Sequence, residues 1–259
     1  MRIYQIDSFT DRLFSGNPAG VCLLEENWLP DELMQNIAAE NNLSETAFVR
    51  RGETWEIRWF TPSVEVGLCG HATLAAAHAL FFHENVRDDV LVFKSKRGII
   101  KVERDDEMLV LDFPQDNINR IDLCKYSDVF QTRPKEFWRG TEEYIFVYEN
   151  ESDIENAVCD LQKAAETDLS GFIITAASNR AGIDFVSRYF APKIGIDEDP
   201  VTGSAHTLLA PYWQGVTGKN EFIALQISKR GGRLHLNIEG DRVKIGGKAV
   251  TFFAGEAFI

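Results

Sequence analysis

The sequence has few cysteines, no long hydrophobic run and a shortage of positive charge. Its 259 residues include 4 cysteines, and no two of them are spaced as C-x-x-C; they are Cys22, Cys69, Cys124 and Cys159. Sparse, unpaired cysteines are typical of a protein whose thiols stay reduced. We therefore expect free thiols and a cytoplasmic location.

Membrane spans and a secretory signal are not indicated either. The most apolar stretch, residues 74–82, contains His78 and is far shorter than the roughly 20 apolar residues of a spanning helix. The first 17 residues lack a continuous apolar segment and carry charges at Arg2, Asp7, Asp11 and Arg12. We expect no membrane partner.

The charge balance argues against polyanionic partners. Lys and Arg number 27 against 40 Asp and Glu, which gives a formal net charge of -13. This charge repels phosphate backbones and anionic membrane surfaces, so we expect no nucleic acid partner. A small anionic ligand is still compatible with it, because a local site can oppose the overall field. The hydrophobic share of 44% excludes a disordered chain.

The common cofactor and metal motifs are missing as well. The chain has no G-x-G-x-x-G, no phosphate-binding loop lysine motif, no G-x-S-x-G and no H-E-x-x-H. We therefore expect neither a bound cofactor nor a metal site.

The two halves of the sequence resemble each other. Three short motifs recur in the same order: RWFTP and RYFAP begin at Arg58 and Arg188, GHA and GSA at Gly70 and Gly203, and SKRG at Ser95 and Ser228. The offsets are 130, 133 and 133 residues, and one three-residue insertion between Pro192 and Gly203 explains the change. Two copies predict two similar domains, at residues 1–116 and 117–259, with a C-terminal tail able to pair with the first.

Each half is expected to fold as strands before and after one apolar helix. Segment 70–82 is apolar almost all round, as buried helices are. The second half repeats this order, with a helix from about Ser204. We predict an α+β fold of two pseudo-symmetric domains, each a curled, barrel-like sheet around a central helix, with a ligand cleft between them. The strands predicted from alternation lie at residues 3–9, 20–24, 43–49, 54–60, 90–93, 98–104, 108–113, 143–147 and 172–175 and around 234 and 243, and a further helix starts near residue 29.

Each central helix begins just after a glycine, at Gly70-His71 and at Gly203-Ser204. The first amides of a helix have no partner within it and point outward, so they form a site for an anion. For either motif alone, an ordinary glycine before a helix is the alternative. Because both halves keep the motif, we expect the two helix starts to bind one small carboxylate.

Glu45 is a candidate for acid–base chemistry. It lies in the short apolar strand LSETAFV, where burial would raise its pKa toward the range of about 6–7 that a general acid or base needs. An exposed strand glutamate is the alternative. The matching LSG motif of the second half has Gly171 in this place, so only one half would carry the acid.

Further candidates lie beside the two helix starts. Asp199 precedes a proline that fixes the backbone, five residues before Ser204. His71 could hydrogen-bond a ligand or move a proton, or only cap its helix. His206 and Trp213 either shape specificity or pack.

The sequence resembles the phenazine-biosynthesis PhzF-like family, whose members share the two-domain fold of diaminopimelate epimerase. The resemblance covers the whole chain and rests on six motifs: DSFT from Asp7, GNPAG from Gly16, LSET from Leu43, FTP from Phe60, CGHAT from Cys69 and DPVTGSA from Asp199. It implies a homodimeric, cofactor-independent isomerase that moves a proton along a small cyclic dienoic acid. It further implies that Glu45 is the catalytic acid/base, and that the substrate pocket is lined by His71, Asp199 and Ser204.

One difference from the epimerase relatives is informative. Those enzymes use two thiols, one on each face of the substrate carbon, and Cys69 resembles the first. Segment 199–203 offers no second cysteine, which disfavours a two-thiol racemase.

The leading hypothesis is a cofactor-free isomerase for a small carboxylate. Glu45 would move the proton, and Asp199 with His71 would orient the substrate. The amides at Gly70 and at Gly203-Ser204 would hold the carboxylate. An amino-acid racemase or epimerase, with a carboxyl in place of one thiol, is an alternative. So is a non-catalytic small-molecule binding protein of the same fold.

Overall fold

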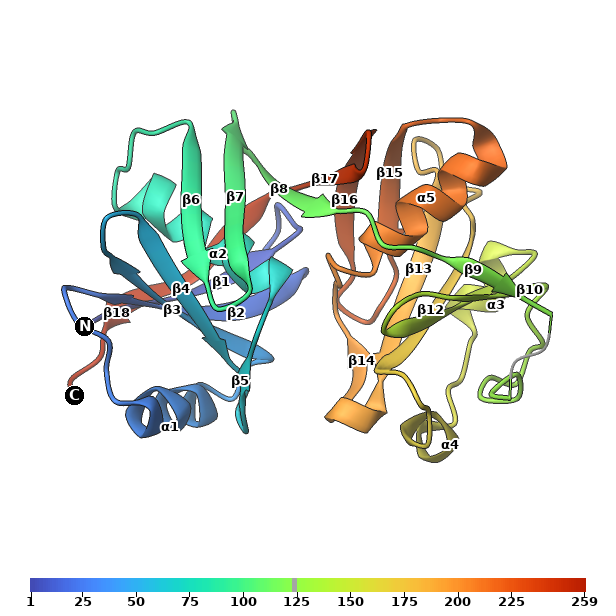
Figure 1. Cartoon of the computed structure of the whole chain (residues 1–259), viewed down its shortest axis with the longest axis horizontal. Coiled ribbons are helices and arrows are strands. Elements are labelled where there is room, and N and C mark those ends of the chain that lie inside the picture. The colour runs from blue at the N-terminus through green and yellow to red at the C-terminus, as the bar shows by residue number, and fades with distance from the viewer. Residues whose placement is uncertain (123–124) are drawn as a thin grey trace. The chain divides into compact units, whose positions relative to one another are not determined.

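The chain divides into two compact units (Figure 1). The computed structural model describes residues 1–122 and 125–259, so the thiol expected at Cys124 lies outside the described residues. Unit 1 consists of Met1–Asp112 and Gly246–Ile259, and unit 2 consists of Phe113–Ile245. Among the described residues, no helix is long and apolar enough to cross a membrane.

Unit 1 combines a curled sheet with two α-helices. Its elements are β1 (Arg2–Ser8), β2 (Asn17–Leu24), α1 (Asp31–Asn41), β3 (Glu45–Arg51), β4 (Trp55–Phe60), β5 (Glu65–Val66), α2 (Gly70–His78), the π-helical turn η1 (Ala79–His83), β6 (Val90–Ser95), β7 (Gly98–Asp105), most of β8 (Met108–Pro114) and β18 (Ala249–Glu256).

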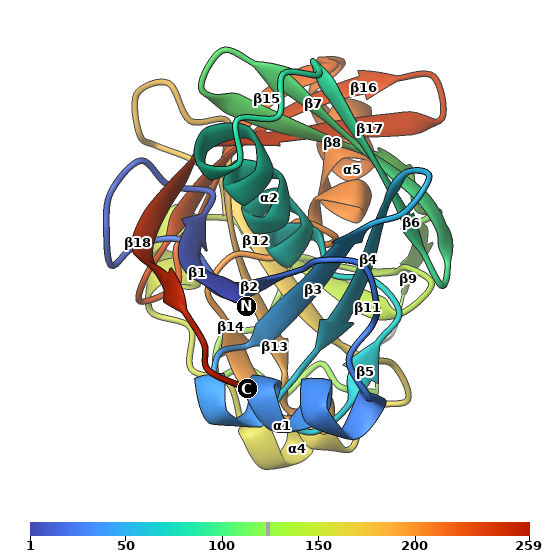
Figure 2. The same ribbon diagram turned by 90° about the vertical axis from the view of Figure 1, so that its left-hand side faces the viewer.

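The strand order of unit 1 places α2 on one face of the sheet. β1 pairs antiparallel with both β2 and β18, β2 runs parallel to β3, and β3 is antiparallel to β4. β4 runs parallel to β6, which continues antiparallel into β7 and β8. α2 packs against β1, β2, β3 and β18, whereas α1 packs against β3 and β4 (Figure 2).

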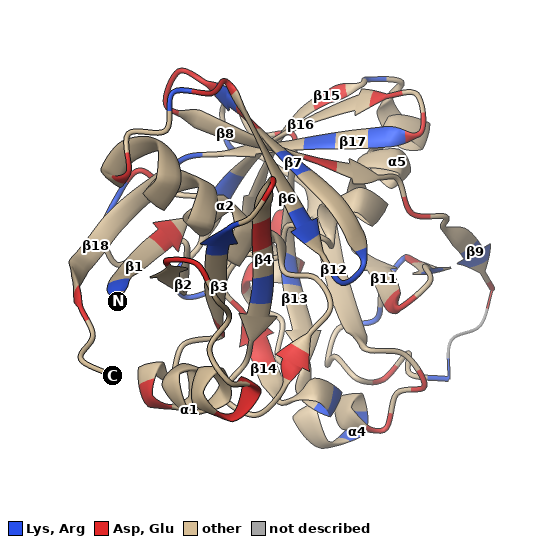
Figure 3. Cartoon of the chain, turned by 60° about the vertical axis from the view of Figure 1, so that its left-hand side comes forward, with Lys and Arg blue, Asp and Glu red and all other residues tan. Residues whose placement is uncertain are grey.

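The two helices of unit 1 differ as their sequences predict. Asp31 and Glu32 lie in the first turn of α1, where the helix dipole favours negative charge, and Met34 and Ala38 form its buried stripe. α2 carries no Lys, Arg, Asp or Glu (Figure 3), and its residues 71–77 are all buried. The segment predicted as one helix over 70–82 is α-helical to His78 and continues as a π-helical turn.

Unit 2 repeats the arrangement. Its elements are β9 (Asn119–Ile121), β10 (Glu136–Arg139), β11 (Glu143–Val147), α3 (Glu151–Glu155), α4 (Leu161–Ala165), β12 (Gly171–Ala177), β13 (Phe185–Ala191), the 3-10 turn η2 (Pro192–Ile194), β14 (Ile196–Asp199), α5 (His206–Thr217), β15 (Glu221–Gln226), β16 (Gly232–Glu239) and most of β17 (Arg242–Gly247). β11 and β12 are parallel, β12 and β13 antiparallel, β13 and β15 parallel, and β15 and β16 antiparallel.

The two faces of the unit 2 sheet pack against different partners, a helix on one side and an aromatic core on the other. One face packs on α5: Trp213 stacks on Phe185 and donates a hydrogen bond from Nε1 to Thr175 Oγ1 at 3.1 Å. The other face carries an aromatic core that includes Phe146 and Phe172. Odd and even residues of β12 therefore face opposite sides, as the pleat of a strand requires.

Matching ion pairs support the internal duplication. Arg58 donates two hydrogen bonds to Glu65, of 2.7 and 2.8 Å, and Arg188 donates two to Glu198, of 2.6 and 2.9 Å. The arginines stand at equivalent positions of β4 and β13, and the glutamates lie on β5 and β14. The predicted α+β fold, a curled sheet with a central apolar helix in each half, is confirmed.

The start of the second central helix was predicted too early. Gly203 and Ser204 lie in a turn, and α5 begins at His206. The carbonyls of Gly203 and Ser204 accept hydrogen bonds from the amides of His206 and Thr207, at 3.0 and 2.9 Å. These bonds span three residues rather than four, so the chain tightens into a 3-10-type turn before the α-helix.

Candidate functional site

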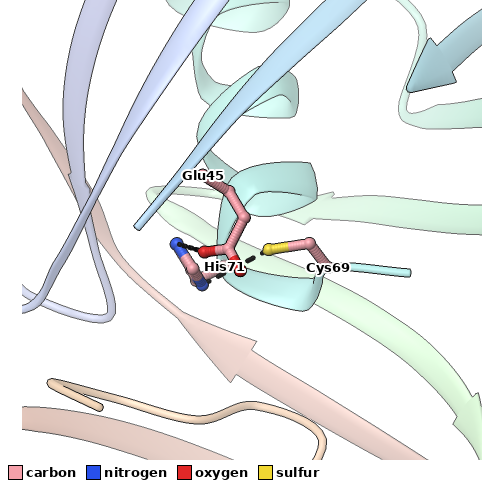
Figure 4. Close-up of side chains that lie close together, drawn as sticks. All are labelled: Glu45, Cys69 and His71. Atoms are coloured by element: carbon pink, nitrogen blue, oxygen red, sulfur yellow. Dashed lines mark hydrogen bonds and ion pairs between the residues drawn. The ribbon is translucent and has the colours of Figure 1, made fainter. Parts of the chain in front are cut away.

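Glu45, Cys69 and His71 meet in unit 1 (Figure 4). Glu45 is the first residue of β3, Cys69 precedes α2 as its N-cap, and His71 is the second residue of α2. All three are buried, and their ligand-type atoms lie within 4.8 Å of one another. The β2–β3 pairing thus brings two residues that lie far from α2 in the sequence, Glu45 and Asn17, to the N-terminal end of this helix.

Glu45 is held on the helix-facing side of the sheet. Its neighbour across the parallel β2 strand is Ala19, a small side chain that leaves room for the carboxyl. Two residues further along the same face, Ala47 is fully buried. Glu45 itself is 9% exposed, so its carboxyl is a buried group and not a solvated strand glutamate.

His71 is a neutral imidazole near neutral pH. Burial lowers its pKa to about 3, because the charged ring would lose its hydration. Asn17 Nδ2 lies 3.2 Å from His71 Nδ1, and Cys69 Sγ lies 3.5 Å from the same nitrogen. An amide NH₂ group donates, so Nδ1 accepts and the ring proton resides on Nε2.

That proton faces Glu45. His71 Nε2 lies 3.3 Å from Glu45 Oε2, although the two groups are too poorly aligned for a hydrogen bond. Since the ring is neutral, the N–H dipole of His71 faces the carboxyl of Glu45, and the contact is not an ion pair. His71 can therefore stabilise a carboxylate at Glu45 without carrying a charge of its own.

The backbone at this helix start is also fixed. Ser8 Oγ donates to the carbonyl of His71 at 2.8 Å, and Thr73 Oγ1 donates to the carbonyl of Cys69 at 2.6 Å. The leading amides of α2, at Gly70 and His71, have no partners within the helix and form the positive end of its dipole. The first helix therefore starts where the sequence predicts, and anion binding at this start stays a prediction.

Glu45, Cys69 and His71 are also the donor types that could hold a metal ion. The thiol faces Nδ1 of the ring, however, and the carboxyl contacts Nε2. One ion can bind only one imidazole nitrogen, so shared ligation would require the ring or one of its neighbours to rotate. The arrangement suits proton transfer better than chelation.

In unit 2, Asp199 is buried and tightly held. It is 6% exposed, and its Oδ2 accepts a hydrogen bond from Thr202 Oγ1. Gln226 connects the two residues: its Nε2 donates to the Asp199 carbonyl at 2.9 Å, and its Oε1 accepts from the Thr202 amide at 2.8 Å. Ser204 is exposed and Gly203 is buried in the turn before α5.

The predicted residues thus fall into two sets. Glu45, His71 and Gly70 belong to unit 1, and Asp199 with the Gly203-Ser204 turn belongs to unit 2. Action of both sets on one substrate stays a prediction. Of the residues left open, His206 Nδ1 donates to the Thr202 carbonyl at 2.8 Å and the ring is fully buried beside Phe185, so it packs. Trp213 packs as well.

Two residues were missed by reasoning from the sequence. Asn17, which orients His71, lies in the GNPAG motif, and no sequence pattern indicates a role for it. Glu143, at the start of β11, is buried with a pKa raised to about 7 by desolvation, with Glu142 and Asp116 adding to the shift. The Gly171 of the LSG motif was the available signal, because β11 pairs Glu143 with it.

Comparison with known proteins agrees with the fold and the motifs. The family model described as phenazine biosynthesis-like protein, PhzC-PhzF, matches residues 6–255. A Pseudomonas aeruginosa protein named an uncharacterized isomerase is 47% identical over 257 residues, covering 98% of this chain and 97% of that protein. The crystal structure of an Enterococcus faecalis protein of the PhzF family superposes with a TM-score of 0.95 at 42% identity, covering 100% of this chain and 99% of that one.

A more distant structure extends the fold relationship. A probable proline racemase from Agrobacterium radiobacter, only 10% identical, reaches a TM-score of 0.64 over 100% of this chain and 93% of its own. This likeness concerns the fold alone and agrees with the predicted epimerase-like architecture. Matched over nearly its whole length by the family model, the chain belongs to the PhzC-PhzF family of phenazine biosynthesis-like proteins.

Proposed function

We propose that the protein is a cofactor-independent isomerase in which Glu45 moves a proton on a small, cyclic, unsaturated carboxylic acid. The observation that carries this proposal is the contact of a buried carboxyl with a neutral imidazole at the start of a buried helix. Membership of the PhzC-PhzF family and a relative named an isomerase support the reaction class.

The proton step balances without an oxidant. The Glu45 carboxylate takes a proton from the substrate carbon that bears the carboxyl group, where neighbouring double bonds delocalise the electron pair. The carboxylic acid so formed exchanges its proton with water and then protonates a distant carbon of the same conjugated system. One C–H bond breaks, another forms, and a double bond moves. Positioned proton transfer of this kind contributes typically about 10²- to 10⁴-fold in rate.

The surrounding residues favour this exchange. The Nε2 proton of His71 stabilises Glu45 when it is charged, and Asn17 fixes the tautomer that makes this contact. The amides at Gly70 and His71 suit the substrate carboxylate. We propose that Asp199 and the Gly203-Ser204 turn serve the same reaction, with Asp199 orienting the ring or an amine on it.

Isotope exchange tests the proposal directly. The probe is 2,5-cyclohexadiene-1-carboxylate, whose C1 proton is acidified by the carboxyl group and two double bonds, within a panel of related cyclic dienoic acids. Turnover in D₂O should place one deuterium in the isomerised, conjugated product, observed by mass and by new ultraviolet absorbance. Glu45→Gln should reduce the exchange rate by about 100-fold or more, because the amide cannot accept the proton.

The exposed Glu53 provides the matched control. Glu53→Gln removes one carboxylate from unit 1 and should leave the exchange rate unchanged. Undiminished exchange in Glu45→Gln contradicts the proposal. Ligand-induced thermal stabilisation across the panel, with no exchange in any compound, would favour the binding-protein alternative.

Cys69 supports a second candidate function. Its sulfur lies 3.5 Å from His71 Nδ1 within the same buried cluster as Glu45, so a thiol is available there as a second acid–base group. An amino-acid epimerase of this kind would confine deuterium to the α carbon and invert optical rotation. The homodimer implied by the resemblance and the cytoplasmic location also stay predictions.

A further inference from the structure

The two units carry their polar groups at different places on equivalent strands. In unit 1, the parallel pair β2–β3 sets Ala19 opposite Glu45. In unit 2, the equivalent pair β11–β12 sets Glu143 opposite Gly171. Each unit thus pairs one carboxyl with one small residue at this point of the sheet. The carboxyl stands on the second strand of the pair in unit 1 and on the first strand in unit 2.

The carboxyl stands on different strands in the two units for a steric reason. A Cβ atom at Gly171 would lie 2.5 Å from the carbonyl oxygen of Phe190 and 3.0 Å from the Cβ of Ala191. The first contact is with backbone, which cannot rotate away. A glutamate equivalent to Glu45 would therefore displace β13 from β12, and the carboxyl of unit 2 stands on the neighbouring strand instead.

A second cross-strand pair is apolar in unit 1 and polar in unit 2. β4 and β5 set Trp59 opposite Val66 in unit 1, whereas β13 and β14 set Tyr189 opposite Asp199 in unit 2. Directly opposed residues of an antiparallel pair point to the same face. Three polar side chains of unit 2 thus replace three apolar ones of unit 1 at matching points: Glu143, Tyr189 and Asp199 replace Ala19, Trp59 and Val66.

The three polar side chains of unit 2 form a buried series. Glu143 is 9% exposed, and the Tyr189 hydroxyl donates to its Oε1 at 3.4 Å. Tyr189 stands opposite Asp199 in the β13–β14 pair, and burial raises the pKa of its hydroxyl, with the carboxyls of Glu143 and Asp199 raising it further. Asp199 is in turn fixed by Thr202 and Gln226.

We propose that Glu143 is a positioning residue for Asp199, acting through the hydroxyl of Tyr189. When Glu143 is charged, the phenolic proton is directed at it. When Glu143 is protonated, its own O–H can donate to the Tyr189 oxygen, and the phenolic proton is released to turn away from Glu143. The charge of Glu143 thereby sets the polarity of the group beside Asp199. The link to turnover rests on the proposed function, in which Asp199 orients the substrate.

The charges around Glu143 place this change near neutral pH. Burial raises its pKa to about 7, Glu142 on the same strand and Asp116 add to the rise, and the bond from Tyr189 opposes it. β12 contributes only Gly171 at this level. Arg139 on the adjacent β10 donates hydrogen bonds to Tyr144 and Asp168.

Carbon-13 NMR of glutamate carboxyls tests the coupling without any substrate. A resonance that titrates near neutral pH and disappears in Glu143→Gln identifies the group. Asp199→Asn removes a like charge and should lower the Glu143 midpoint by about half a unit or more, whereas Tyr189→Phe removes a donor to the carboxylate and should raise it. The exposed Glu221, changed to Gln, is the control and should leave the midpoint in place.

An unchanged Glu143 midpoint in both Asp199→Asn and Tyr189→Phe overturns the proposal, whatever the enzyme's substrate. If turnover is found, the pH profile of kcat provides a second test. Glu143→Gln should remove the limb of the kcat profile that lies near neutral pH. It should retain measurable turnover, whereas Glu45→Gln should not. Superimposable wild-type and Glu143→Gln profiles would also overturn the proposal, while the isomerase assignment would still stand on the Glu45 exchange result.

Discussion

At the scale of single residues, buried histidines make the free energy of unfolding depend on pH. Burial lowers the pKa of His71 to about 3 and the pKa values of His78 and His206 to about 4. Unfolding restores ordinary values near 6.5. The stability these neutral rings provide is therefore complete above about pH 6.5 and is lost as the pH falls toward 4. Glu143 acts in the opposite sense, because its stability contribution is lost as pH rises from about 4.5 to 7.

His206→Gln tests this dependence. Gln can still donate to the Thr202 carbonyl but takes up no proton on unfolding, so the loss of stability between pH 7 and pH 5 should shrink by roughly 2 kcal/mol. Urea unfolding at several pH values measures it. His83→Gln removes an exposed imidazole and is the control. An unaltered pH dependence in His206→Gln would refute the assignment of a neutral buried ring.

The burial of candidate residues was predictable where the motif itself places the residue, and their roles stay predictions. Glu45 and His71 were identified from a carboxyl in an apolar strand and a histidine after a helix-starting glycine, and their mutual contact lies within one unit. Asn17 and Glu143 depend on which strand pairs with which, and at what register. A pattern along the chain does not contain that information directly, and the glycine at position 171 was the one indirect signal for Glu143.

At the scale of elements, β12 and β13 approach so closely at Gly171 that no side chain fits between them. Gly171→Ala should destabilise the protein by about 1–3 kcal/mol, because the strands must separate to admit the methyl group. Gly215 on α5 is a matched control: a Cβ there meets nothing within 4 Å, and alanine in a helix should stabilise by up to about 1 kcal/mol. Thermal unfolding of both variants should show shifts of opposite sign.

Most elements of unit 1 were predictable, whereas β10, α3, α4 and β15 of unit 2 were not predicted from the sequence. Period-two alternation identified strands such as β7 and β8, and an apolar composition identified α2 and α5 as buried helices. The α5 start was missed because Gly203 and Ser204 make three-residue-spaced bonds, a choice set by local hydrogen bonding and not by hydrophobic pattern. The π-helical turn after His78 was missed for the same reason.

At the scale of the whole molecule, unit 1 is assembled from two separated parts of the chain. The strand β18 pairs along all of β1, from Arg2 with Glu256 to Ser8 with Ala249, and the amide of Thr10 donates to the carbonyl of Lys248 at 3.1 Å. Removal of residues 246–259 therefore strips β1 of one neighbour and leaves unit 2 continuous.

We expect a chain ending at Ile245 to lose the cooperative unfolding and protease resistance of unit 1 and to retain those of unit 2. Limited proteolysis with mass mapping distinguishes the two, since cuts should concentrate within residues 1–112. Addition of a synthetic peptide of residues 246–259 should restore protection. Equal protection of both units without β18 would contradict this expectation.

The same discontinuity constrains the order of folding during synthesis. Every residue of unit 2 is translated before β18, so unit 2 can complete its hydrogen-bonded ladder while β1 still has an open edge. An open strand edge invites pairing with other chains until its own partner arrives. The last segment of unit 1 to be synthesised would thus decide how long a nascent chain stays prone to aggregation, and codon choice or temperature could alter the yield of this protein without altering its final stability.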